Sequence, residues 1–207
     1  MVGVIVGGNA AKGHRIICRP FQFATGDTQL PVTVTDQEIT RLNEAGVKAV
    51  RFNIKRGGSE KLQYLESLAE QVYDLAKWHV ELYVDSSELD NLKDRLIKLP
   101  AVSIDHLGLS KKGFKTLLWL VERGVKVKAT GFGRVDFDVK QALQDVCKAN
   151  PDALIFGTDR PSTRAPRPYS DDDIRLLIDA LGGYAEKVFY DNALSLYQLS
   201  KTIDLAQ

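Results

Sequence analysis

Leu154-Ile-Phe-Gly-Thr-Asp-Arg-Pro161 has the pattern of a buried strand that stops abruptly. Its apolar residues run into Gly157, and a carboxylate (Asp159) and a guanidinium (Arg160) follow at the carboxyl end of the strand. In α/β folds, ligands are held at that end of the strands. An alternative interpretation is that Asp159 only caps the next turn and that Arg160 is a solvated surface charge. The segments on either side of this stretch help to decide between the two.

The preceding segments repeat a unit in which a helix is followed by glycine and a strand. Thr35 and Glu38 have the spacing of a capping box at a helix start, Gly46 ends that helix, and residues 47–54 form the next strand. Strict alternation of helices and strands gives an open doubly wound sheet or a (β/α)8 barrel, and the short, even units favour the barrel. Further strands are predicted at residues 80–85, 101–105, 125–130 and 154–158, and further helices at residues 59–77, 86–99, 110–123, 138–148, 170–181 and 191–199.

The amino-terminal part departs from this alternation. Residues 2–6 and 15–20 are predicted as strands, but the roughly eight residues between them are too few for a crossover helix. Residues 21–34 are predicted as a loop. The result is about seven strands, one fewer than a (β/α)8 barrel has. We therefore predict an α/β fold, a single TIM-barrel-like (β/α)8 domain over residues 1–207 that lacks the first strand.

Composition excludes several classes of function. The 207 residues carry a formal net charge of +1, which gives no electrostatic basis for binding nucleic acid or an anionic membrane. No stretch approaches the ~20 apolar residues of a membrane span, and the start of the chain lacks the charged region of a secretory signal. Cys18 and Cys147 are isolated, which is typical of a reducing compartment. We therefore expect a cytoplasmic protein.

Polar residues gather after the carboxyl ends of the predicted strands, and in a barrel all these ends open on one face. Arginine side chains bind carboxylates at two points, and a carboxylate beside a histidine is suited to activating water. Each residue taken singly has an ordinary explanation, but the set predicts a site that hydrolyses an ester, lactone or amide in an acidic molecule. Lys126 and Lys128 alternate with apolar residues and indicate a strand edge or a polar layer instead. The set comprises Arg51, Asn53, Lys55, Arg56, Tyr83, Asp85, Asp105, His106, Arg134, Asp159, Arg160, Arg164 and Arg167.

Five short motifs carry a resemblance to a known family: residues 46–53 (GVKAVRFN), 102–108 (VSIDHLG), 125–131 (VKVKATG), 156–161 (FGTDRP) and 191–193 (DNA). In order and spacing they resemble the amidohydrolase superfamily, in particular its amidohydrolase-related (type 2) branch, which includes 2-pyrone-4,6-dicarboxylate lactonase and sugar-lactone hydrolases. The resemblance covers roughly residues 35–199. It implies a distorted (β/α)8 barrel and a hydrolase, of the lactonase kind in this branch.

The resemblance also implies roles for single residues. By position, Asp159 resembles the aspartate on the last strand that activates water, and His106 resembles the histidine that helps to polarise the scissile carbonyl. Tyr83 stands where the lactonase-like group has tyrosine and many metal-using relatives have histidine.

Three arginines resemble groups that bind the substrate in this branch. Arg51 and Arg56 resemble the pair that grips substrate carboxylates, and Arg134 resembles a further substrate arginine. The implied partner is a small anionic molecule.

The chain departs from the family in its histidines. The family's first strand carries His-x-His, whereas this sequence contains only His14, His79 and His106. One site histidine does not suffice for a binuclear zinc site, and the lactonase group works without a metal, so we expect no cofactor. Two alternatives stay open: a metal-dependent amidohydrolase with one divalent ion such as zinc or manganese, and a truncated, inactive barrel that only binds an acidic ligand. A homodimer would cover the open edge of such a barrel.

Overall fold

The computed structural model describes residues 26–162 and 164–199 of the chain. Its six strands form one parallel sheet in which the spatial order equals the order along the chain. That order is the one expected when each strand is followed by a helix that leads to the neighbouring strand. The strands are β1 (Gly26–Thr28), β2 (Val47–Asn53), β3 (His79–Tyr83), β4 (Val102–Ile104), β5 (Lys126–Ala129) and β6 (Leu154–Phe156).

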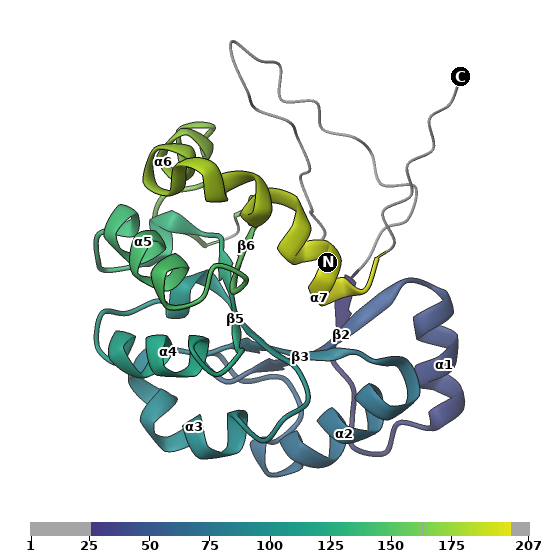
Figure 1. Cartoon of the computed structure of the whole chain (residues 1–207). Coiled ribbons are helices and arrows are strands. Elements are labelled where there is room, and N and C mark those ends of the chain that lie inside the picture. Colours follow the sequence, from purple (N-terminus) through teal and green to yellow (C-terminus); the bar gives the residue numbers. More distant parts are fainter. Residues whose placement is uncertain (1–25, 163, 200–207) are drawn as a thin grey trace, which may run out of the picture.

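The α-helices of the described part are α1 (Asp36–Glu44), α2 (Leu65–Ala76), α3 (Leu89–Leu96), α4 (Phe114–Val121), α5 (Val139–Ala149), α6 (Asp172–Leu181) and α7 (Asn192–Tyr197). The sheet curves, and α1 to α6 form an arc around its outer side (Figure 1). This arrangement confirms the α/β class and the barrel-like architecture predicted from the sequence. None of the helices found within residues 26–162 and 164–199 is long and apolar enough to cross a membrane.

Of the two hydrogen bonds of the capping box predicted at the start of α1, the structure contains one. Thr35 Oγ1 accepts a hydrogen bond from the backbone N–H of Glu38 at 3.2 Å, as an N-cap does. The Glu38 carboxylate, however, accepts from Nε and Nη2 of Arg41 at 2.8 and 2.7 Å. Since its side chain is bound to the next turn, the predicted capping box is not closed.

The two faces of the sheet differ because successive side chains of a strand point to opposite sides. The outward-facing residues, among them Phe52, Leu82 and Val127, belong to the main hydrophobic core with the helices. On the inner face, Arg51 of β2 and Lys128 of β5 both pair with Glu81 of β3. The curved sheet thus separates an apolar outer layer from a polar interior.

Helix α7 lies on the inner side of the sheet, between β6 and β2 in Figure 1. Ala193, Leu196 and Tyr197 pack against Ile155, the inward-facing residue of β6. The Tyr197 ring meets the ring of His79 edge-on, with centroids 5.2 Å apart. The last helix therefore spans from the final strand to the start of β3.

Several predicted boundaries are wrong. The segment 21–34, predicted as a loop, contains β1, whose three residues pair with β2 but show no alternating pattern. The helices predicted from residues 59, 86 and 110 begin later, and the first two are preceded by 3-10 turns at Leu62–Tyr64 and Ser86–Glu88. The strands predicted at residues 2–6 and 15–20, and the prediction that the first strand is missing, fall outside the described residues.

Candidate active site

The six residues expected from the sequence to form the site meet at the carboxyl ends of β2 to β6. Arg134 Nε donates to Asp159 Oδ2 at 2.7 Å, and His106 Nε2 lies 3.9 Å from Asp159 Oδ1. The Tyr83 ring stands edge-on to the His106 ring with centroids 5.5 Å apart. We call these residues the strand-end cluster; its members are Arg51, Arg56, Tyr83, His106, Arg134 and Asp159.

The arginines of β2 and its following turn complete the cluster. The guanidinium carbons of Arg56 and Arg51 lie 5.2 and 5.8 Å from the centre of the Tyr83 ring, within reach of cation–π attraction. Arg56 is exposed, whereas only 18% of the Arg51 side chain is. Two guanidinium groups therefore lie close to the Tyr83 ring.

His106 and Asp159 share an uncommon backbone conformation. Their φ angles are +51° and +55°, in the left-handed region that non-glycine residues rarely adopt. Such conformations are held in place by the surrounding structure and cluster at functional sites. His106 lies two residues beyond the end of β4 and Asp159 three residues beyond the end of β6, and their side chains approach each other to 3.9 Å.

Burial and a hydroxyl partner define the state of His106. Its Nδ1 lies 2.7 Å from Thr130 Oγ1, and both residues are buried. Burial, together with the positive charges of Arg134, Arg51 and Lys128, lowers the pKa of His106 to about 3. The imidazole is therefore neutral at physiological pH.

Acid is expected to destabilise the fold through its buried histidines. Burial also lowers the pKa of His79 to about 3. Between about pH 3 and 6.5 the unfolded chain binds two more protons at these rings than the folded chain does. The pKa of Asp105 is raised to about 7, so in this pH range the folded chain binds about one proton there that the unfolded chain does not, and the difference falls to about one proton. The free energy of unfolding should fall by about 1.4 kcal/mol per pH unit from pH 6 to 4.5.

Urea unfolding at several pH values checks this expectation. The His79→Phe variant removes one of the two rings, and Phe suits a buried position beside Tyr197. Its stability should depend less steeply on pH than that of the parent protein. A free energy of unfolding that stays constant from pH 6 to 4.5 would contradict the assignment of neutral, buried histidines.

A polar layer lies beneath the strand-end cluster, inside the sheet. Arg51 pairs with Glu81 and, at 2.5 Å, with Asp105 Oδ2, and its Nη1 lies 3.7 Å from Asp27 Oδ2. Lys128 pairs with Glu81 and lies 3.6 Å from Asp105 Oδ1. Three carboxylates thus face two cations in a buried space. Of the two interpretations of Lys128, the polar layer is the one found.

The polar layer has one carboxylate more than it has cations. The pKa values of its two most buried carboxylates are shifted in opposite directions. Although burial opposes ionisation, Lys128 and Arg51 lower the pKa of Glu81 to about 2. Burial and the adjacent Glu81 charge raise the pKa of Asp105 to about 7. Asp105 is therefore the group of this layer that changes charge near neutral pH.

Sequence reasoning missed Glu81, Asp27 and Thr130. Glu81 is flanked by apolar residues in β3, and this alternation was the available signal for an inward-facing charge. Asp27 lies in a strand that was not predicted. Thr130 directly follows β5 and belongs to the 125–131 motif, but nothing local in the sequence indicates that its hydroxyl meets His106.

Other polar residues of the predicted set lie outside the cluster. Asp85 pairs with Lys55 and accepts from Ser110 Oγ at 2.5 Å, and these hydrogen bonds outweigh burial and lower its pKa. Arg160 is exposed and lies over the Tyr169 ring at 4.9 Å. Arg167 pairs with Asp173 at 2.6 Å. These contacts tie loops together rather than extend the site.

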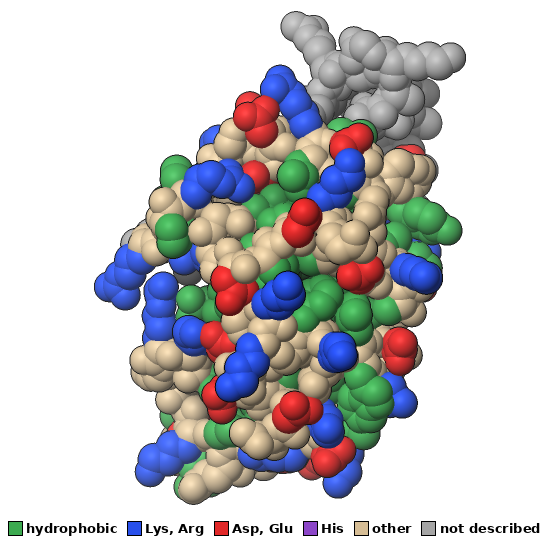
Figure 2. All heavy atoms as spheres, turned by 90° about the vertical axis from the view of Figure 1, so that its left-hand side faces the viewer, with side chains coloured by type: hydrophobic (Ala, Val, Ile, Leu, Met, Phe, Trp, Pro, Cys, Tyr) green, Lys and Arg blue, Asp and Glu red, His purple; other side chains and the backbone are tan. Residues whose placement is uncertain are grey.

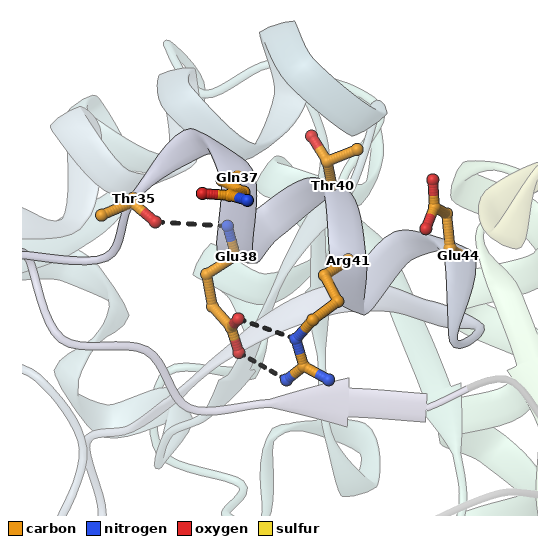
Figure 3. A pocket seen from close by; sticks show the side chains of 6 residues that line it. All are labelled: Thr35, Gln37, Glu38, Thr40, Arg41 and Glu44. Atoms are coloured by element: carbon orange, nitrogen blue, oxygen red, sulfur yellow. Dashed lines mark hydrogen bonds and ion pairs between the residues drawn. The ribbon is translucent and has the colours of Figure 1, made fainter.

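Two outer surfaces of the part of the chain that the structure describes carry no comparable chemistry. A shallow hollow on the exposed side of α1 is lined by residues of that helix and its cap, where Glu38 and Arg41 pair with each other (Figure 3). On the face seen in Figure 2, acidic and basic side chains alternate without a field of one sign. Neither surface brings a titratable group into a buried, convergent arrangement.

Only two members of the strand-end cluster, His106 and Asp159, belong to the residue types that commonly bind metal ions. Within residues 26–162 and 164–199, no three His, Cys, Asp or Glu side chains lie close enough to hold one. Thr130 engages Nδ1 of His106, and Arg134 engages Oδ2 of Asp159. A metal bound to Oδ2 of Asp159 would displace Arg134 from that oxygen. We derive no step through a metal.

Solved structures share this fold. A protein of Agrobacterium tumefaciens, in its apo form, superposes with a TM-score of 0.70 at 22% identity, over 83% of this chain and 69% of that one. A probable 2-pyrone-4,6-dicarboxylic acid hydrolase of Acinetobacter baumannii, with citric acid bound, superposes with a TM-score of 0.69 at 23% identity. The superposition covers 84% of this chain and 73% of that one. An amidohydrolase of Burkholderia multivorans with bound zinc superposes with a TM-score of 0.61 at 16% identity, over 79% of this chain and 70% of that one. The fold is therefore TIM-barrel-like, as predicted.

Sequence comparison leads to the same group of proteins. The 2-pyrone-4,6-dicarboxylate hydrolase of Comamonas testosteroni is 28% identical in an alignment that spans 84% of this chain and 67% of that protein. The model of the Amidohydrolase family matches residues 10–199. The match covers most of the chain and includes every member of the strand-end cluster, so the chain belongs to the Amidohydrolase family of hydrolases.

Proposed function

We propose that the chain hydrolyses a small lactone or ester that carries carboxylate groups, with Asp159 as the group that activates water. One observation supports this most directly: Asp159 lies between Arg134, at 2.7 Å, and the neutral His106, at 3.9 Å. A carboxylate that takes a proton and a neutral donor that polarises a carbonyl are the two groups such a hydrolysis needs. The related proteins act on, or are seen with, acidic molecules: one is a 2-pyrone-4,6-dicarboxylate hydrolase and another has citric acid bound.

The proposed reaction begins with water between Asp159 and the substrate carbonyl. A proton passes from water to Asp159 while the water oxygen bonds to the carbonyl carbon. Negative charge then develops on the former carbonyl oxygen, which His106 stabilises through a hydrogen bond. When the bond to the ring oxygen breaks, the leaving oxygen takes the proton back from Asp159, and a carboxylic acid and an alcohol result.

The arginines are proposed to orient the substrate through its carboxylates. Arg56 is exposed and lies over Tyr83, so an incoming carboxylate meets it first. Arg51 is buried more deeply and is held by Glu81 and Asp105, so it offers a fixed charge at the base of the site. Arg134 lies on the opposite side, beside Asp159.

A panel of carboxylated lactones, with ring opening followed in the presence and absence of a chelator, tests the proposal. Turnover that survives the chelator is the expected result, because we propose a reaction without a metal. Turnover that the chelator abolishes would favour the metal-dependent alternative, for which the zinc-bound relative of the same fold is the specific observation. Tight dicarboxylate binding by calorimetry without turnover would favour an inactive barrel.

The apparent KM for a carboxylated substrate is expected to rise about threefold to tenfold between pH 6 and pH 8, because one added charge acts through a partly screened environment. Asp105 contacts Arg51 and has a pKa of about 7. Above that pH its negative charge offsets the attraction of Arg51 for the substrate. The Asp105→Asn variant, measured in the same buffers, should show a flatter KM profile. An unchanged profile in this variant would show that Asp105 does not tune Arg51.

A further inference from the structure

We propose that Thr130 is a positioning residue that fixes the tautomer of His106: its hydroxyl donates to Nδ1, so the ring carries its proton on Nε2 and directs it toward the reaction centre. The inference rests on the proposed function for its catalytic meaning. The tautomer of His106 itself can be tested without measuring any activity.

The first step is the contact itself. Thr130 Oγ1 and His106 Nδ1 are 2.7 Å apart, a short hydrogen-bond distance. Thr130 and His106 are only 7% and 8% exposed, so the contact lies in a buried environment. A hydroxyl can donate or accept, and the far side of the ring decides which it does here.

On the far side, Nε2 faces Asp159. Its distance to Oδ1 is 3.9 Å, and a carboxylate can only accept. A neutral imidazole carries one N–H. If the proton were on Nδ1, the lone pair of Nε2 would face the negative charge of Asp159, which is unfavourable in a buried site. With the proton on Nε2, the N–H points at the carboxylate and at a carbonyl oxygen that enters between them.

Gly131 restricts the ring further. A Cβ atom at this position would lie 2.7 Å from His106 Nδ1 and 2.9 Å from Arg134 Cδ, and the residue has φ +59°. The imidazole and the Arg134 side chain therefore lie directly against the backbone that follows Thr130. Tyr83 closes another side of the ring, with centroids 5.5 Å apart. Because the ring is enclosed in this way, its tautomer decides what it presents to the substrate.

Nitrogen-15 NMR of the histidine side chains tests the inference directly, because protonated and unprotonated ring nitrogens have distinct shifts. The chain has three histidines, and loss of one signal set in His106→Asn assigns the ring. We expect Nδ1 of His106 to be unprotonated and Nε2 to be protonated at pH 7. A proton on Nδ1 in the parent protein would overturn the inference, whether or not the protein is active.

A matched pair of variants separates the hydroxyl from packing. Thr130→Val keeps the shape without the hydroxyl, and Thr130→Ser keeps the hydroxyl. We expect Thr130→Val to change the tautomer signals and to lower kcat roughly 10- to 100-fold with little change in KM, and Thr130→Ser to resemble the parent protein in both. Thr116→Val, at a half-buried residue of α4, controls for the substitution itself.

The outcomes distinguish this inference from the proposed function. An Nε2–H tautomer that is lost in Thr130→Val supports the inference even if no lactone is hydrolysed, in which case the proposed function alone fails. A kcat that falls in Thr130→Val while the tautomer signals stay unchanged would show a packing effect and overturn the inference. Equal loss of kcat in Thr130→Ser and Thr130→Val would overturn it as well.

Discussion

Replacing Asp159 with asparagine is expected to lower kcat on an accepted lactone by about 10³-fold, within the range that general base catalysis supplies. The amide oxygen of Asn can still accept from Arg134 Nε, which Asp159 binds at 2.7 Å. Asn also tolerates the left-handed backbone conformation of residue 159, where φ is +55°. The variant therefore keeps shape and fold and loses only the capacity to take a proton from water.

Steady-state kinetics with a thermal unfolding curve for each protein check this expectation. Asp179→Asn is the matched control, because Asp179 lies on the outer helix α6 and its carboxylate pairs with Lys140 at the surface. The control should turn over like the parent protein. Full activity in a folded Asp159→Asn protein would exclude Asp159 as the group that activates water and with it the proposed mechanism.

Replacing Lys128 with methionine is expected to lower the free energy of unfolding by about 3 kcal/mol or more, the usual effect of breaking a buried ion pair from one side. The ammonium of Lys128 contacts Glu81 and lies 3.6 Å from Asp105. Without it, three buried carboxylates of the polar layer face the single charge of Arg51. The uncharged methionine side chain cannot balance the negative charge of these carboxylates, so Glu81 must bind a proton or the layer must open.

Lys126→Met provides a control on the same strand. The Lys126 ammonium donates to the carbonyl oxygen of Asp152 at 3.0 Å and does not pair with the polar layer, so the loss of stability should be smaller. The double variant Lys128→Met with Glu81→Gln removes the unpaired charge and should recover part of the stability. Chemical denaturation of the four proteins decides the matter. Equal effects of Lys126→Met and Lys128→Met would show that the layer is not a coupled ion network.

Local patterns were sufficient to predict much of this protein. The apolar run at 154–156, the glycine after α1 and the alternation of helices and strands predicted the α/β class and the carboxyl-end location of the cluster. The N-cap Thr35 was predicted correctly because a cap depends on residues three positions apart. The resemblance of short motifs then assigned the six residues of the cluster, and the structure brings these six together at the strand ends. Their catalytic and binding roles stay predictions.

Tertiary structure alone decided the remaining features. β1 has three residues and exists through its pairing with β2, a contact that no local pattern encodes. The same holds for α7 on the inner face, where Tyr197 meets His79 from a distant part of the sequence. Whether Lys128 lay at an edge or in a buried layer depended on Glu81, 47 residues away.

The sequence by itself determined which chemical groups stand at the ends of the strands, because strand and turn signals are local and a strand's end has a defined place in a parallel sheet. The tertiary structure decided how those groups are held. Thr130 beside His106, Arg134 on Asp159 and the carboxylates around Arg51 are contacts between separate strands. Hydrogen bonds and charge pairs of this kind depend on distance in space, which only the folded chain sets.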